Sequence, residues 1–139
     1  MPLNVTISEQ ELRGLLESGF LLRERMEFDK ALEVFEGAVA LRPDVEVAQL
    51  GLANMYEVTG RHKDAQAVLE TLVKKNPKSA VAQLQLGEFF HTHGKKDEAK
   101  KALDQAMALD PNGPTGDAAR ATLAVIDQGI DYSYDMSKK

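Results

Sequence analysis

Three histidines are the residues of this sequence whose chemistry best suits catalysis or metal binding. His91 and His93 are two positions apart, so on a helix their rings point in different directions and cannot easily share a metal ion. His62 has no cysteine and no converging set of carboxylates to complete a site, and the chain contains no cysteine at all. Ser8 and Ser79 lack a His/Asp arrangement that would activate a hydroxyl nucleophile. We therefore expect no enzyme, with no catalytic residue, no metal and no cofactor.

The charge of the chain argues against nucleic acid as a partner. Its formal net charge is −5, and the charge is uneven: −6 over residues 1–60, +2 over 61–111 and −1 over 112–139. Such a gradient either orients a partner or a second copy, or is a local bias of a solvated surface. The sequence shows no secretory signal and no apolar run of bilayer length. We expect a cytoplasmic protein that does not bind membranes.

The elements that carry these residues are set by a repeat of 34 positions. Prolines stand at 43, 77 and 111, and small residues at 31, 65 and 99 and at 19, 53 and 87 keep the same interval. Larger apolar residues do the same at 35, 69 and 103 and at 22, 56 and 90. Each repeat contains two amphipathic helices, and the small residues mark where these helices approach most closely. Self-similarity at this period predicts a stacked array of helix pairs.

Capping signals mark the ends of these helices. N-caps are predicted at Ser8, which forms a capping box with Glu11, and at Asp44, Ser79 and Thr115. Gly60 and Gly94 are predicted to end first helices in the left-handed conformation.

On these residues the chain resembles the tetratricopeptide repeat family from about Leu12 to Gln128. The second and third repeats carry the full pattern, as Leu52-Ala53…Tyr56…Gly60…Ala65…Leu69…Pro77 and Leu86-Gly87…Phe90…Gly94…Ala99…Leu103…Ala106…Pro111. The first repeat departs from it at Ser18 and Met26, and Leu15, Gln49 and Gln83 replace the aromatic residue usual near the start of each repeat.

The resemblance implies an all-α fold, a right-handed α-α superhelix of antiparallel helix pairs. We expect a flexible arm at 1–7 and a repeat domain at 8–128, followed by a disordered tail at 129–139. Within the domain the repeats would span about 12–45, 46–79 and 80–113, with a capping helix at 115–128.

The resemblance also implies a non-catalytic protein-binding module, whose first helices line a concave groove. By register the groove would present Arg13, Leu16, Phe20, Arg23, Val47, Leu50, Asn54, Glu57, Val81, Leu84, Glu88 and His91. The clamp for chaperone C-terminal carboxylates is absent, because its positions hold Leu16, Phe20, Gly51, Val81 and Gln85. The apolar groove floor favours an amphipathic helix or extended peptide as partner. A small repeat protein with such a groove resembles adaptors, scaffolds and the secretion chaperones of the bacterial type III system.

Three alternatives remain open at this point. The aliphatic and aromatic groove residues could simply pack against neighbouring repeats. The lysines at 74, 75, 78, 95, 96, 100 and 101 could contact an acidic partner or form a solvated face. The protein could instead be a structural or self-associating subunit, its groove filled by a second copy or by its own tail with Tyr132, Tyr134 and Met136.

Overall fold

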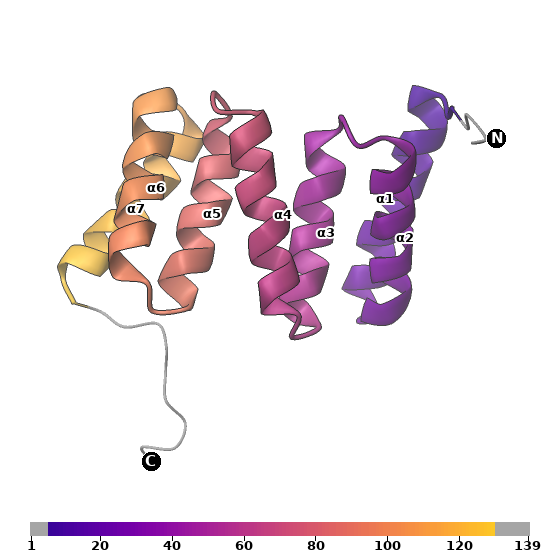
Figure 1. The fold of residues 1–139 in the computed structure, drawn as a ribbon, viewed down its shortest axis with the longest axis horizontal. Helices are drawn as coiled ribbons and strands as arrows, with labels where there is room; N and C mark the ends of the chain where they lie inside the picture. The colour runs from indigo at the N-terminus through magenta and orange to yellow at the C-terminus, as the bar shows by residue number, and fades with distance from the viewer. Residues whose placement is uncertain (1–5, 130–139) are drawn as a thin grey trace, which may run out of the picture. The chain divides into compact units, whose positions relative to one another are not determined.

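A computed structural model describes residues 6–129 of the chain as seven α-helices, with no strand among them (Figure 1). The helices are α1 (Glu9–Glu24), α2 (Phe28–Leu41), α3 (Glu46–Val58), α4 (His62–Lys75), α5 (Ala80–Thr92), α6 (Lys96–Leu109) and α7 (Pro114–Asp127). Residues 130–139 of the predicted tail and residues 1–5 of the predicted arm lie outside the described part. Within the described part, none of the helices has the length and apolar character needed to cross a bilayer.

The chain divides into two compact units, Met1–Leu72 and Val73–Lys139, which are described separately. The first contains α1, α2, α3 and most of α4. Its core gathers buried residues of α2 and α3, namely Ala31, Leu32, Phe35, Leu52 and Met55. Val68 of α4 also packs against this cluster.

Phe35 is the largest side chain that is completely buried in the first unit. It lies edge-on to Phe20 of α1, with the ring centroids 5.1 Å apart. A Cβ atom at Gly19 would lie 2.9 Å from this ring, and a Cβ atom at Gly51 would overlap it. The close helix approach predicted at Gly19 is therefore confirmed, while the approach at Gly51 is an additional one.

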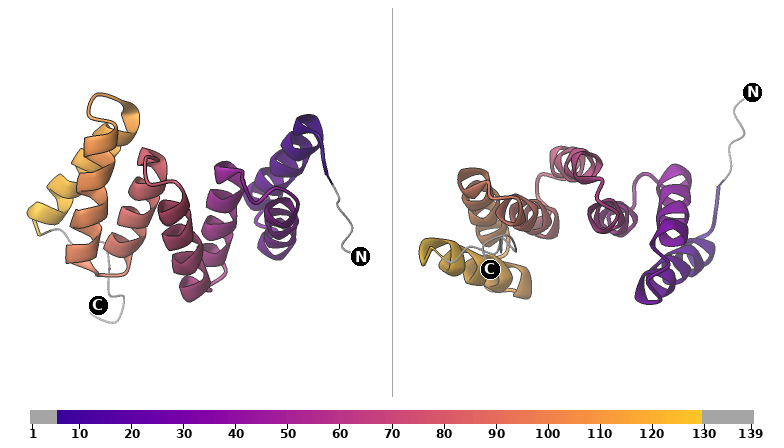
Figure 2. Two further views of the ribbon diagram at one scale, coloured as in Figure 1. Left: turned by 45° about the horizontal axis from the view of Figure 1, so that its top comes forward. Right: turned by 90° about the horizontal axis from the view of Figure 1, so that it is seen from below.

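In the second unit, α5, α6 and α7 pack side by side, and α7 contacts both of the others (Figure 2). A Cβ atom at Gly87 of α5 would lie 2.7 Å from Cγ of Leu103 on α6. Ala99 and Ala106 of α6 and Ala119 of α7 are completely buried. Small residues allow these helices to approach closely, as the repeat pattern predicts.

Three residues at equivalent repeat positions have a positive φ at the turn after a first helix. Gly60 has φ +83° and Gly94 has φ +74°, which confirms both predicted left-handed ends. In the first repeat the same position is held by Met26, with φ +62°. Its side chain is 73% exposed, so little packing offsets the steric cost of this conformation.

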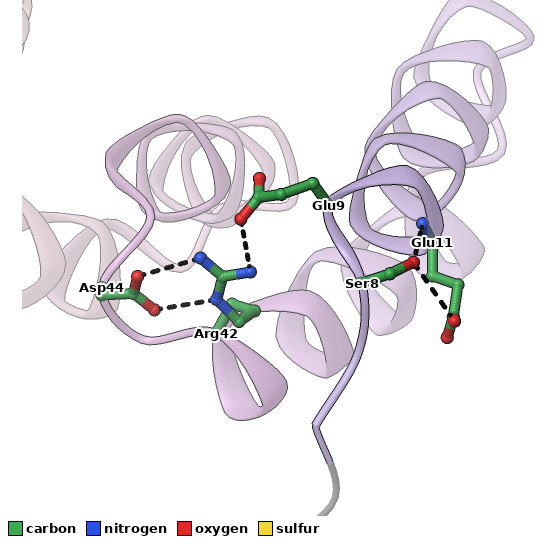
Figure 3. Close-up of polar contacts among 5 residues, drawn as sticks. All are labelled: Ser8, Glu9, Glu11, Arg42 and Asp44. Carbon is green, nitrogen blue, oxygen red and sulfur yellow. Dashed lines mark hydrogen bonds and ion pairs between the residues drawn. The ribbon is translucent and has the colours of Figure 1, made fainter.

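The hydroxyls of Ser8 and Ser79 accept hydrogen bonds from the backbone N–H of Glu11 and Ala82 at 3.0 and 3.1 Å, so both predicted N-caps are confirmed. The carboxyl group of Glu11 contacts the Ser8 hydroxyl at 3.2 Å (Figure 3).

The predicted N-cap at Asp44 is wrong. The first residue of α3 is Glu46, and its N-cap residue, Val45, makes no side-chain cap. Asp44 is instead engaged by Arg42, which donates to both of its carboxylate oxygens at 3.1 Å and to Glu9 at 2.9 Å (Figure 3). The two bonds from Arg42 to Asp44 lower the pKa of that carboxyl group, and the bond from Arg42 to Glu9 joins the start of α1 to the linker between α2 and α3.

The predicted N-cap at Thr115 is also wrong, because α7 already begins at Pro114. Asp110 supplies the cap from outside the helix. Its Oδ2 accepts the backbone N–H groups of Thr115 and Gly116 at 3.1 and 3.3 Å.

Candidate functional site

The twelve residues predicted to line a binding groove lie on three helices. Four belong to α1 and four to α3, both in the first unit, and four belong to α5 in the second unit. Each face is therefore considered within its own unit.

On α1 the predicted residues are of two kinds. Arg13 and Arg23 are exposed, whereas Leu16 and Phe20 are half-buried and pack against the core of the first unit. The alternative that Leu16 and Phe20 serve packing therefore holds for the buried part of their side chains. Their remaining surface lies between two exposed cations on the same helix.

Arg23 is linked to α3. Its Nη1 donates a hydrogen bond of 2.9 Å to Oδ1 of Asn54, and its guanidinium carbon lies 5.9 Å from the centre of the Phe20 ring. Asn54 is itself exposed. The structure thus brings together three predicted site residues from two repeats: a cation, an amide and an aromatic ring.

On α3, Val47 is 46% exposed, so its apolar side chain meets solvent. The spacing of apolar residues along this helix (Val47, Leu50, Leu52, Ala53 and Tyr56) predicts that Val47 faces inward, and its exposure shows that this prediction is wrong. Leu50 and Glu57 are half-buried. Oε1 of Glu57 lies 2.5 Å from Nδ1 of His62, which turns this carboxylate toward the start of α4.

On α5 the four predicted residues differ widely in burial. Val81 is 41% exposed, whereas Leu84 is only 8% exposed. Leu84 is thus part of the interior and is not available as a surface contact, contrary to its place among the predicted groove residues. Glu88 and His91 are half-buried, and burial raises the pKa of Glu88 above its ordinary value.

Two features of these helices were missed by reasoning from the sequence. Gln49 and Gln83 are buried where the repeat pattern usually has an aromatic residue, and the side-chain amide of Gln49 donates to the backbone carbonyl of Pro43. The recurrence of glutamine 34 positions apart was the available signal. Leu21 and Val58 are the other missed feature, since both are nearly half exposed although neither was assigned to a surface.

The lysine clusters lie in the second unit. Nζ of Lys100 is 3.0 Å from the Asp127 carboxylate of α7, and the ammonium of Lys95 lies 6.0 Å from the ring centre of Phe90. These two lysines therefore have partners within the unit. Contact of the remaining lysines in these clusters with an acidic protein stays a prediction.

Comparison with protein families identifies one match. The family model described as "Tetratricopeptide repeat" matches residues 22–86 and 60–124, which together cover most of the chain. No curated protein matches the sequence.

Solved structures with the same fold include PcrH from Pseudomonas aeruginosa, with 19% identity and a TM-score of 0.77 over 93% of this chain and 98% of that one. The Yersinia enterocolitica type III secretion chaperone SycD, in complex with a peptide of the translocator YopD, has 20% identity and a TM-score of 0.75, covering 88% and 96%. The first tetratricopeptide domain of Spaghetti (RPAP3), bound to an HSP90 peptide, has 22% identity and a TM-score of 0.74, covering 88% and 95%. With the helix pairs described above, these similarities confirm the predicted all-α repeat fold.

Proposed function

The chain belongs to the tetratricopeptide repeat family, and from this premise we propose that it is a non-catalytic module that binds another protein. The bound segment is a peptide or an amphipathic helix, and the surfaces proposed to contact it are the exposed faces of α1 and α3 in the first unit and of α5 in the second. No catalytic residue and no cofactor takes part.

The observation that carries the proposal is a pair of exposed valines. Val47 and Val81 occupy the same repeat position, 34 residues apart, in the first turns of α3 and α5. Each is more than two-fifths exposed, while the next residue, Ala48 or Ala82, is completely buried. The recurrence of an exposed apolar side chain at the same position of two repeats supports a role for these positions in contact with a partner.

The chemistry of these positions favours a partner with apolar anchors flanked by charges. Half-buried Leu16, Phe20 and Leu50 add apolar surface, while Arg13 and Arg23 add exposed positive charge. Amphipathic helices and extended peptides offer this combination of side chains. As a finer proposal, the protein acts as a chaperone for an aggregation-prone protein, which is supported by its likeness to SycD, a secretion chaperone solved with a translocator peptide.

The test is an affinity capture from the source cell with wild type beside the double variant Val47→Asp, Val81→Asp. Both valines are exposed, so the variant is expected to keep its helicity and melting temperature. Leu21→Asp is the matched control, because Leu21 is 47% exposed on α1 and lies outside the predicted set. A partner retained by wild type and by the control, but lost by the double variant, supports the proposal.

If wild type, the double variant and the control all retain the partner, then the partner binds elsewhere on the protein and the proposal is wrong. Light scattering on the same samples separates the alternative of self-association. A wild-type dimer that becomes monomeric in the double variant would mean that a second copy covers the valines.

A further inference from the structure

The arginines of the first unit differ in how their charge is compensated. Arg42 is bonded to the carboxylates of Glu9 and Asp44, and Arg61 to that of Asp64 at 2.9 Å. Arg23 also makes a bond of 2.9 Å, but this bond goes to the neutral amide of Asn54. Its position is therefore fixed by the protein while its charge has no acidic partner in the described part of the chain.

The remaining donors of this pair face solvent. A guanidinium group carries five N–H donors in a planar fork, and the bond to Asn54 uses one of them. Because Asn54 accepts that bond with its oxygen, its amide nitrogen retains two N–H donors, for which residues 6–129 show no acceptor. Both side chains are exposed. An arginine and an amide nitrogen side by side match the two oxygens of a carboxylate.

An apolar contact lies directly beside these donors. The Arg23 guanidinium lies over the half-buried Phe20 ring, 5.9 Å from its centre, so a ligand that reaches the guanidinium also comes close to this ring. The nearest acid along α3, Glu57, has its carboxylate turned to His62 at 2.5 Å. It therefore does not occupy the Arg23–Asn54 pair.

We infer that Arg23 and Asn54 form a carboxylate-binding site for an Asp or Glu side chain of the bound peptide, with Phe20 receiving an adjacent apolar side chain. This inference rests on the proposed function, because it names the recognition chemistry of the same surface. The site differs from the family's clamp for chaperone C-terminal carboxylates. The positions of that clamp are held in this chain by Leu16, Phe20, Gly51, Val81 and Gln85.

The test uses a phage library of random peptides of roughly 16 residues, about four helical turns, selected on the whole 139-residue chain. We expect wild type to enrich peptides that carry an acid at a fixed spacing from an apolar residue. In a synthetic peptide from this set, changing the acid to its amide is expected to weaken binding by about 10-fold, as for loss of a charged hydrogen bond. The same change should have little effect on binding to Arg23→Gln.

Asn54→Asp is the sharpest variant, because it replaces one amide nitrogen by oxygen. It gives Arg23 an acidic partner and removes both amide donors, so binding of the acidic peptide should fall by about 10-fold while the fold is kept. Arg25→Gln is the matched control, since Arg25 is an exposed arginine at the C-cap of the same helix. It makes the same change in net charge as Arg23→Gln and should leave binding unchanged.

The possible outcomes separate this inference from the proposed function. If peptides are selected without an acid preference and bind wild type, Arg23→Gln and Asn54→Asp equally, the carboxylate site is wrong and the binding module stands. If Arg25→Gln weakens binding as much as Arg23→Gln does, the effect is one of overall charge and the site is again wrong. If wild type enriches no peptide above an unrelated protein, the proposed function fails and the inference fails with it.

Discussion

The ring of Phe35 on α2 occupies the space that a side chain at Gly51 on α3 would need. A Cβ atom at Gly51 would lie 2.7 Å from Cδ1 of Phe35, closer than packed carbon atoms approach. The ring is completely buried, so it cannot avoid the added atom by turning out into solvent. Gly51→Ala should therefore lower the free energy of unfolding by about 1–2 kcal/mol, as overpacked cores do. Urea unfolding followed by circular dichroism measures this.

Gly37→Ala is the matched control for this substitution. Gly37 is an exposed glycine inside α2 with nothing within 4 Å of a Cβ atom, so alanine should stabilise by about 0.5–1 kcal/mol through helix propensity. Phe35→Leu should relieve the clash, since leucine stands at the equivalent positions 69 and 103. A double variant Phe35→Leu, Gly51→Ala whose loss equals the sum of the single losses would contradict direct contact.

Met26→Gly is expected to stabilise the protein. Met26 adopts φ +62° and is 73% exposed, so glycine would remove a steric cost and lose little packing. The greater freedom of glycine in the unfolded chain offsets part of the gain, which leaves about 0.5–1 kcal/mol. Thermal melts of the two proteins measure the difference. At the equivalent turn of the second repeat, Gly60→Ala adds a side chain at a positive φ and should destabilise the protein by about 1 kcal/mol. A more stable Gly60→Ala variant would contradict the proposed steric cost at this position.

The features of the fold that the sequence predicts are those that recur or act locally. The 34-residue period places the helix pairs and the buried small residues, and the caps at Ser8 and Ser79 involve amides only a few positions away. Gly51 escapes this reasoning because its equivalents are Glu17 and Gln85, so no repeat pattern marks it. A glycine is needed at position 51 because the ring of Phe35 lies against it, whereas the other repeats have leucine at the position of Phe35.

The candidate site was predictable to a similar extent. Register alone gives the exposure of Val81 and Arg23, because each helix shows a fixed face, whereas the periodicity of apolar residues wrongly places Val47 inward. It does not give the burial of Leu84, which depends on which side chains meet it in three dimensions. Nor does it give the bond from Arg23 to Asn54, because the two residues are 31 positions apart and belong to different repeats.

Asp110→Ala should destabilise the last helix, whereas Thr115→Ala should not. The Asp110 carboxylate accepts two backbone N–H groups in the first turn of α7, and loss of such a cap costs about 1 kcal/mol. Thr115 lies within the helix and its side chain supplies no cap. Chemical unfolding of both variants compares the two residues directly. Equal losses, or a larger loss for Thr115→Ala, would restore the capping role that the sequence alone suggests for threonine.

Glu88→Gln should stabilise the protein at neutral pH, and the gain should shrink on acidification. Burial alone raises the pKa of Glu88, because among residues 6–129 no hydrogen bond or nearby charge favours its carboxylate. A carboxyl group with a raised folded pKa gives up its proton more readily in the unfolded chain, so wild type loses stability as pH rises through that pKa. Glutamine has no proton to lose. The two proteins should therefore be closest in stability below about pH 4, near the ordinary pKa of glutamate, and furthest apart above the raised pKa.

Unfolding midpoints of wild type and Glu88→Gln, measured from about pH 3 to about pH 8, test this dependence on both sides of the ordinary glutamate pKa. A variant that is less stable than wild type at pH 8 would mean that the charged carboxylate is favourably placed. The Glu88 carboxylate lies on the α5 face proposed to bind a partner. A cation from that partner would offset the desolvation cost of the charged carboxylate. Binding of a partner with a lysine or arginine at this point should then weaken in Glu88→Gln even though the variant is the more stable protein.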